Sequence, residues 1–370
     1  MVDTRFFRRA DFVMLACVII LISIGCVMIF SCTRGALSKQ GLAQTKTVRM
    51  QLIWVLVGLA AMFVMMAIDY SRVASFHMLI YGVTALLLVA VFFCRPINGA
   101  YRWIIIGPIR LQPAEFAQLA MVIFIASMTS AQEKAGDFFA ITKTFAWMIP
   151  VIVLILKEPD LGTPVLMFVV WASMMFLSGA RIQHLVGYAS AGVLLFLAAW
   201  FSGAISDEQK ARILVFLHPE LYRHGDGYQQ YHSLIAVGSG GVFGQGLFQG
   251  KQTQGAWIPD QHTDFIFTGI AEEFGFIGAV LVLALFGLLL WRCTVVMFES
   301  KDLLGRLLVC GVTAMIGMHV LVNVSMTMAL GPVKGMPLPL VSYGGSSMLT
   351  TLMGLGIVQS VHMRRHKIAF

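Results

Sequence analysis

The chain has 370 residues, of which 58% are hydrophobic and only 12% are charged. Soluble domains usually carry about 25% charged residues, so a soluble fold of this length would leave much apolar surface exposed. The formal net charge of +8 comes from Lys and Arg residues scattered along the chain. The composition therefore excludes an ordinary soluble enzyme, predicts a lipid environment and gives no reason to expect a nucleic-acid partner.

Ten apolar segments are expected to cross the bilayer, which takes about 20 mainly apolar residues in a helix. The segments must be helical, because isolated strands leave backbone polar groups unsatisfied in hydrocarbon. The sequence thus predicts an all-α polytopic membrane protein with about ten transmembrane helices. The expected spans are 12–30, 52–68, 76–93, 116–130, 145–156, 163–179, 184–203, 265–291, 307–324 and 348–361.

The placement of basic residues predicts the orientation in the membrane. Arg5, Arg8 and Arg9 precede the first span, and an even number of spans returns the C-terminus, with Arg364 and Arg365, to the same side. Basic residues favour the cytoplasmic side, so both termini are expected in the cytoplasm. The first span is expected to be a retained anchor rather than a cleaved signal peptide, because it is long and further spans follow.

The chain reads as a single domain, 1–370, with one large external loop at about 204–264, between the seventh and eighth spans. The cytoplasmic loops are short, so no soluble catalytic domain is expected on that side. Long loops in compact proteins are usually functional. Any chemistry is therefore expected at the outer face, near this loop.

The segment 257–267 places polar and ionisable residues directly before a predicted helix, with Asp264 at its mouth. Asp264 or Thr263 suits a helix N-cap, an assignment that requires no function. The same helix continues through Glu272 and Glu273, and ionisable groups at membrane depth are costly and usually functional. Eight residues of helix rise about 12 Å, so Asp264 and Glu272 are expected to begin a column of carboxylates running inward.

The segment 157–164, between the fifth and sixth spans, carries three charges in a tight turn. Lys157 and Asp160 are expected close to the edge of the bilayer. Asp160 suits the N-cap of the following helix, helped by Pro164 in the first turn. It equally suits a functional acid, and the residue types alone leave both assignments open.

Two further segments contain candidate substrate contacts. Arg102 adjoins Trp103, a pair that suits a lipid headgroup, although aromatic residues also anchor interfaces without a ligand. Glu115 opens the fourth span, where a carboxylate interacts favourably with the helix dipole. Segment 331–347 contains three prolines and four glycines, which predict irregular backbone of the kind that lines cavities. Lys334 in this segment is placed to approach phosphates, although the P-loop pattern is absent.

Seven motifs, in order along roughly two-thirds of the chain, resemble the SEDS family (shape, elongation, division and sporulation), most closely its RodA branch. They are 98–103, 111–116, 158–163, 233–241, 262–267, 272–275 and 337–347. Segment 250–254 is RodA-like, whereas 332–335 is similar to the division branch, FtsW, as well. The resemblance implies a peptidoglycan glycosyltransferase of the bacterial cytoplasmic membrane that polymerises lipid II and releases undecaprenyl diphosphate. It also implies two kinds of partner, a class B penicillin-binding protein and the elongation machinery.

The resemblance implies that Asp264 is the family's essential aspartate, and we expect it to be the general base. An aspartate withdrawn from water is a stronger base than the free side chain. Cations such as Arg102, Lys157 or Arg212, or a divalent cation (Mg²⁺ or Mn²⁺), would neutralise the leaving diphosphate, although no dedicated metal cage is evident. The expected substrate-binding residues are Arg102, Trp103, Glu115, Lys157, Asp160, Arg212, His262, Lys334 and Ser342.

Two other functions fit parts of the pattern. A lipid II flippase would also carry carboxylates inside a helix bundle, but it needs sites open to both sides of the membrane. Here the distinctive polar residues crowd the outer half, which favours the enzyme. A non-catalytic scaffold for the elongation machinery would leave the carboxylates unexplained.

Overall fold

The computed structural model describes residues 9–39, 45–96, 101–107, 109–132, 136–158, 160–203, 205, 210–211, 214–216, 225 and 227–365. The elements are α1 (Phe12–Lys39), α2 (Thr45–Ala67), α3 (Tyr70–Ser75), α4 (His77–Ala90), η2 (Val91–Phe93), β1 (Ile104–Ile106), β2 (Ile109–Leu111), α5 (Pro113–Ser130), α6 (Phe138–Lys157), α7 (Gly162–Leu177), α8 (Ile182–Phe201), α10 (Tyr228–Gly240), α11 (Lys251–Gln254), α12 (Ile266–Glu299), α13 (Leu303–Thr327) and α14 (Gly345–Met363).

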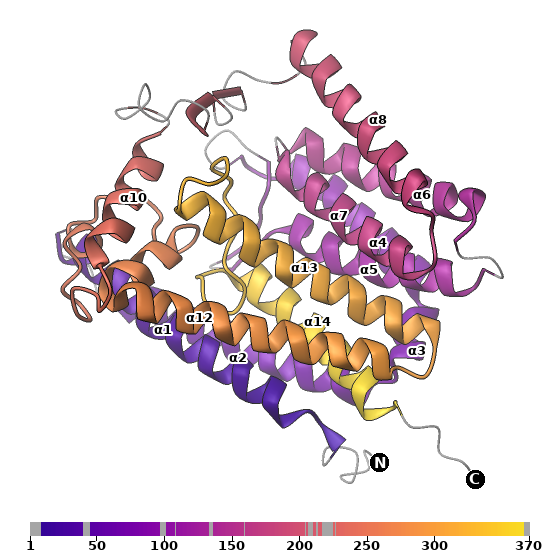
Figure 1. Cartoon of the computed structure of the whole chain (residues 1–370), viewed down its shortest axis with the longest axis horizontal. Helices are drawn as coiled ribbons and strands as arrows, with labels where there is room; N and C mark the ends of the chain where they lie inside the picture. Colours follow the sequence, from indigo (N-terminus) through magenta and orange to yellow (C-terminus); the bar gives the residue numbers. More distant parts are fainter. Residues whose placement is uncertain are drawn as a thin grey trace.

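Each of the ten expected spans coincides with a helix of the bundle in Figure 1. Within the described residues, α1, α2, α5, α6, α8, α12 and α13 are long and apolar enough to cross a bilayer. Two apolar helices are shorter, α7 and the pair α4 and η2. The tenth, α14, has 19 residues and includes several buried hydroxyl side chains. The all-α polytopic membrane fold expected from the sequence is confirmed.

The helices differ greatly in how much they are covered by their neighbours. In α5, 83% of the most apolar stretch is buried inside the protein, and in α13 the share is 61%, whereas in α8 it is 0%. Figure 1 shows α8 at the edge of the bundle. Side chains of α5 and α13 are therefore held by packing from several helices, and α8 presents apolar side chains to lipid.

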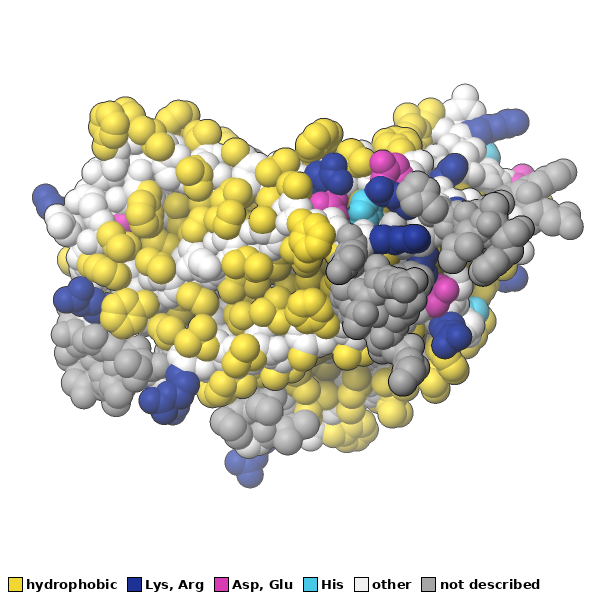
Figure 2. Space-filling model, turned by 90° about the horizontal axis from the view of Figure 1, so that it is seen from below, with side chains coloured by type: hydrophobic (Ala, Val, Ile, Leu, Met, Phe, Trp, Pro, Cys, Tyr) yellow, Lys and Arg dark blue, Asp and Glu magenta, His cyan; other side chains and the backbone are white. Residues whose placement is uncertain are grey.

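The two ends of the bundle are polar and the surface between them is apolar. Figure 2 shows this broad apolar surface on one face, with the charged side chains gathered toward the ends. The start of α1 and the end of α14 lie at the same end of the bundle in Figure 1, and Arg365, just after α14, forms an ion pair of 2.6 Å with Glu299, the last residue of α12. A helix of 34 residues is about 50 Å long. Asp264, which precedes α12, therefore lies at the end of the bundle opposite the start of α1 and the end of α14.

The glycine-rich segment 238–246 packs its backbone against α12. The helix is interrupted at Gly275, which has φ 67° and ψ −163°. Four backbone hydrogen bonds join the segment to the helix on either side of this break. The N–H groups of Gln245 and Gly246 donate to the carbonyls of Glu272 and Glu273 (both 3.0 Å), and those of Phe276 and Ile277 donate to the carbonyls of Gly241 and Val242 (2.9 and 3.2 Å). Glycine lets two backbones approach this closely, which accounts for the composition of the segment.

Within the expected external loop at about 204–264, the described part includes α10 and α11. A small antiparallel hairpin, β1 with β2, precedes α5, and Ile104 lies opposite Leu111. The sequence did not suggest this hairpin. With three residues in each strand, it leaves the all-α class unchanged and places Arg102 and Trp103 just before β1.

Candidate active site

Asp264 lies in the turn that leads into α12. Backbone N–H groups of Thr263 (3.1 Å) and Asp264 (3.3 Å) both donate to the Asp260 carbonyl and close this turn. The N-cap of α12 is Phe265, and no side chain makes a cap hydrogen bond there. The cap assignment considered for Thr263 and Asp264 is therefore wrong. The Asp264 carboxylate is half-exposed.

Asp160 caps α7 and also meets a buried cation. Its Oδ1 accepts hydrogen bonds from the backbone N–H groups of Gly162 (3.0 Å) and Thr163 (3.2 Å), and its Oδ2 accepts one from the Thr163 hydroxyl (2.7 Å). The same Oδ1 lies 3.9 Å from Nζ of Lys334. The two assignments left open by the sequence, helix cap and member of a charged site, are thus compatible.

Lys334 reaches this site from the loop that precedes α14. Its side chain lies across Gly162, where a Cβ would overlap the lysine methylenes. The Nζ atom is buried and has no hydrogen-bond partner among the described residues. The ammonium group is therefore held beside Asp160 by charge alone, with its hydrogen-bonding capacity unused.

Burial and the neighbouring charges together shift the pKa values of Lys334 and Asp160. Burial lowers the pKa of Lys334 to about 8, and the carboxylates of Asp160 and Glu115 oppose that change. Burial raises the pKa of Asp160, but Lys334 and the hydrogen bonds from Thr163 outweigh it and leave the pKa below its ordinary value. At neutral pH the site therefore contains an ionised aspartate and a lysine that is largely protonated.

Glu115 lies in the first turn of α5 and is buried. Its charge interacts with those of Lys334, Asp160 and Asp264. Its Oε2 lies 3.9 Å from Nε2 of His319. The dipole assignment considered from the sequence does not explain these neighbours, and the structure brings Glu115 into one cluster with the two aspartates.

Asp264 itself meets the Lys334 loop at Gly335. A Cβ built on Gly335 would lie 2.8 Å from Oδ2 of Asp264. Lys334 and Gly335 are neighbours in the chain, so Asp160 and Asp264 lie on either side of one short stretch of loop. We call Glu115, Asp160, Asp264 and Lys334 the polar cluster.

Arg102 lies beside this cluster. Nε of Arg102 donates to the backbone carbonyl of Glu158 (2.8 Å), and the charge of Arg102 acts on both Asp160 and Lys334. The carboxyl group of Glu158 is buried without a hydrogen-bond partner among the described residues. Burial, reinforced by Asp160 and opposed by Arg102, raises its pKa to about 8. Trp103 is half-buried.

Four other expected substrate contacts are not members of the polar cluster, and one of them falls outside the described residues. Lys157 is exposed at the end of α6, and Arg212 falls outside the described residues. The His262 carbonyl accepts a hydrogen bond from the Tyr343 N–H (3.0 Å). The hydroxyl of the buried Ser342 accepts one from the Leu338 N–H (2.9 Å). His262 and Ser342 therefore brace the loop before α14.

The expected column of carboxylates is not formed by Glu272. This side chain accepts hydrogen bonds from the backbone of Gln252 (2.7 Å) and from the backbone and hydroxyl of Thr253 (2.9 and 2.7 Å). Oε1 of Glu273 accepts from the Ser31 hydroxyl (2.6 Å). Both glutamates fix neighbouring segments to α12, Glu272 the segment that contains Gln252 and Thr253 and Glu273 the helix α1, because a buried carboxylate needs such donors.

Two residues of α13 belong to the site and were not singled out from the sequence. His319 and Asn323 are spaced four apart, so they share a helix face. The buried Asn323 donates through Nδ2 to the backbone carbonyls of Asp264 (2.8 Å) and Met336 (2.7 Å). The sequence signal for these two residues was the polar pair itself, since polar groups inside an apolar span are rare and usually functional.

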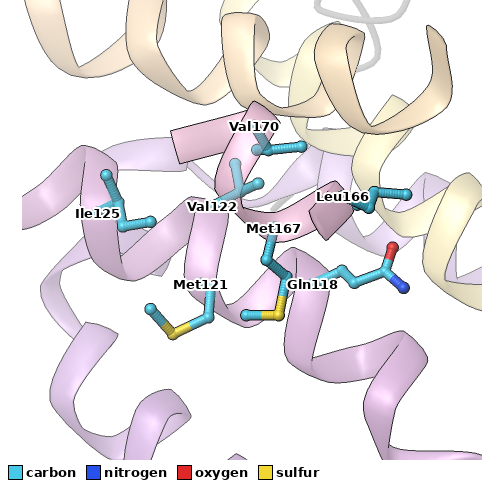
Figure 3. Close-up of a pocket in the computed structure, with 7 residues that line it drawn as sticks. All are labelled: Gln118, Met121, Val122, Ile125, Leu166, Met167 and Val170. Atoms are coloured by element: carbon cyan, nitrogen blue, oxygen red, sulfur yellow. The ribbon is translucent and has the colours of Figure 1, made fainter. Parts of the chain in front are cut away.

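A small pocket lies between α5 and α7 (Figure 3). Gln118, one turn beyond Glu115, contributes its amide, and Oε1 of this buried side chain has no hydrogen-bond partner among the described residues. The remaining lining is apolar: Met121, Val122, Ile125, Leu166, Met167 and Val170. The pocket contains none of the charged residues of the polar cluster.

Known proteins resemble this chain along nearly its whole length. A family model described as "Cell cycle protein", FTSW_RODA_SPOVE, matches residues 11–367. Stage V sporulation protein E of Bacillus subtilis is 33% identical over 95% of this chain and 96% of its own length. Peptidoglycan glycosyltransferase MrdB of Escherichia coli is 34% identical over 84% of each chain. A probable peptidoglycan glycosyltransferase FtsW of Geobacter metallireducens is 34% identical over 96% of each.

Solved structures agree with these relatives. The rod shape determining protein RodA of Thermus thermophilus has a TM-score of 0.70 and 30% identity, covering 97% of this chain and 98% of its own. A chain from work on the coordination of polymerization and crosslinking by a peptidoglycan synthase complex has a TM-score of 0.80 and 29% identity, covering 97% and 99%. With the family model, this likeness establishes that the chain belongs to the FtsW, RodA and SpoVE family, as its motifs led us to expect.

Proposed function

We propose that the chain is a peptidoglycan glycosyltransferase that polymerises lipid II into glycan strands at the outer face of the bacterial cytoplasmic membrane. Relatives that match most of the chain are named peptidoglycan glycosyltransferases, which supports the activity. The observation that carries the proposal is the polar cluster. Three acids and one lysine, from four separate segments, converge at one end of an apolar bundle.

In the proposed reaction, the 4-hydroxyl of one lipid-linked disaccharide attacks the anomeric carbon of a second. Asp264 takes the hydroxyl proton as the new glycosidic C–O bond forms, and the bond to undecaprenyl diphosphate breaks with its electron pair leaving on the diphosphate oxygen. Direct displacement converts an α-linked donor into a β-linked product. Asp264 suits the role of base because its carboxylate is partly exposed and belongs to the polar cluster, where a positioned carboxylate can accept a proton.

Lys334 and Arg102 are proposed to neutralise the leaving diphosphate. Lys334 offers three N–H donors, and none is used within the described residues. Preorganised cations aimed at a developing negative charge are among the largest contributors to catalysis. Within the described residues, no three His, Cys, Asp or Glu side chains lie close enough to hold a metal ion. The donor set therefore does not fit a dedicated cation site, and no step is assigned to a metal.

We further propose a RodA-like role in cell elongation, with a class B penicillin-binding protein as partner. The partner is supported by the likeness to a chain from a peptidoglycan synthase complex. The elongation role rests on the RodA-like segment 250–254. Relatives of the sporulation, elongation and division branches are all 33–34% identical, so identity does not separate the branches, and a division role is the alternative.

The test is polymerisation of labelled lipid II by the purified protein in detergent, with and without its cognate transpeptidase. Wild type is expected to form glycan ladders, and Asp264→Asn is expected to form none while remaining folded. Asp260→Asn is the matched control, because Asp260 is exposed in the same turn and its φ of 52° suits asparagine. Absence of ladders under both partner conditions, with lipid II translocation in liposomes, would instead establish a flippase.

A further inference from the structure

Asn323 connects two loops that are far apart in the sequence and carry different parts of the polar cluster. One Nδ2 group donates to the Asp264 carbonyl at 2.8 Å and to the Met336 carbonyl at 2.7 Å. Asp264 is 59 residues before Asn323, and Met336 is 13 residues after it. Asn323 is fully buried in α13, so this bridge is anchored in the interior of the bundle.

We infer that Asn323 is a positioning residue that fixes the distance between the Asp264 carboxylate and Lys334. The inference rests on the proposed function, in which one group takes a proton and the other meets the leaving diphosphate. Both loops are irregular, and no regular secondary structure pairs one with the other. Gly335, in the second of these loops, lies against Oδ2 of Asp264 in the first. A small shift of either loop therefore changes how Asp264 and Lys334 face a substrate.

The chemistry of the amide explains why asparagine stands here. Two backbone carbonyls require two N–H donors at one point, and an amide nitrogen supplies both. The Oδ1 atom of Asn323 is buried without a partner among the described residues, so the donors are the part of the side chain that is used. Aspartate has nearly the same shape, but it would direct carboxylate oxygens at the two carbonyls.

A second set of hydrogen bonds holds the Asp264 turn independently of Asn323. Nε2 of the buried Gln261 donates to the hydroxyls of Thr253 (3.0 Å) and Thr268 (3.1 Å). These bonds connect the turn to α11 and α12. Loss of the Asn323 bridge is therefore expected to displace the turn locally while the bundle remains folded, which makes the inference testable by substitution.

The experiment compares purified wild type with Asn323→Leu, Asn323→Asp and Asn323→Gln in the lipid II polymerisation assay. Leucine keeps the number and branching of the side-chain heavy atoms and removes both donors, so kcat is expected to fall on the order of 100-fold with KM little changed, because small misplacement of catalytic groups is costly. Asn323→Asp is expected to lose as much of kcat as Asn323→Leu. Glutamine retains the donors on a longer side chain and is expected to recover part of kcat. Ser325→Ala is the control, since its hydroxyl bonds within α13.

Hydrogen–deuterium exchange gives a readout that does not depend on activity. Asn323→Leu is expected to speed exchange in both 260–265 and 332–338, while α13 exchanges as in wild type. An unchanged kcat, or faster exchange in only one of the two loops, would overturn the inference. If wild type forms no glycan, the proposed function is wrong. Faster exchange in both loops of Asn323→Leu would still support the Asn323 bridge between them.

Discussion

Gly335 lies directly against the carboxylate of Asp264: a Cβ at Gly335 would lie 2.8 Å from Oδ2. That separation is shorter than real Cβ contacts, so a side chain at position 335 would displace the aspartate. The neighbouring residue, Lys334, packs across Gly162 in the same way. Two glycines thus allow one loop to lie between Asp264 and Asp160.

Gly335→Ala is expected to lower polymerisation of lipid II by about 10- to 100-fold, because the methyl group moves Asp264 away from its position. Thermal stability should change little, since Gly335 is exposed. The matched control is Gly331→Ala in the same loop, where a Cβ would meet the Ser325 hydroxyl at 3.2 Å. Equal activity of the two variants would contradict the prediction.

Substitutions of Asp160 separate its two roles. Asp160→Ala removes the cap of α7 and should reduce stability by about 1 kcal/mol as well as activity. Asp160→Asn retains an oxygen that accepts the cap hydrogen bonds, so the melting temperature should be restored. Activity should remain low, because the negative charge beside Lys334 is gone. Recovery of both properties in Asp160→Asn would show that the cap alone matters.

The rate of polymerisation is expected to fall as pH rises through about 8, the pKa to which burial lowers Lys334. The protonated lysine is the active form, and its fraction decreases above that pH. Asp160 opposes the lowering of the Lys334 pKa, so Asp160→Asn should move the fall to lower pH. Lys334→Arg should move it to higher pH, since guanidinium stays charged. Rates of lipid II polymerisation across neutral and alkaline pH would check this, and identical profiles would refute it.

Gly275→Ala is expected to destabilise the protein by about 1–3 kcal/mol, the usual cost of a strained backbone conformation. Gly275 has φ 67°, and a Cβ there would overlap the backbone nitrogen of Gly244. Thermal unfolding in detergent would measure the effect. Gly287→Ala, in the same helix with open space around it, should leave the melting temperature unchanged. A similar melting temperature for both variants would show that the break in α12 tolerates a side chain.

Sequence reasoning predicted the transmembrane helices well because hydrocarbon imposes a simple rule: backbone groups must be paired within each segment. All ten expected segments coincide with helices, including 145–156, which contains Pro150 and lies within α6. The rule says nothing about depth in the bundle. It could not distinguish the buried α5 from the exposed α8, because both are apolar stretches of similar length.

The candidate site was predicted less completely. Asp264, Asp160, Glu115 and Lys334 were named from residue types and motifs, and the structure brings them together. Glu272 was expected to extend inward from Asp264, but it bonds to Thr253 instead. The direction of the Glu272 side chain depends on its hydrogen bonds to the loop that contains Thr253. No local sequence pattern specifies the path of that loop.

The sequence by itself determined the membrane class, the helical spans and the acids available for chemistry, because apolar length and residue type are local properties. Only the tertiary structure decided that Lys334 rather than Lys157 meets Asp160, and that Asn323 bridges the Asp264 and Met336 carbonyls. These contacts join segments separated by 13 to 174 positions. They depend on how α5, α7, α13 and two irregular loops pack, and packing is a property of the whole chain.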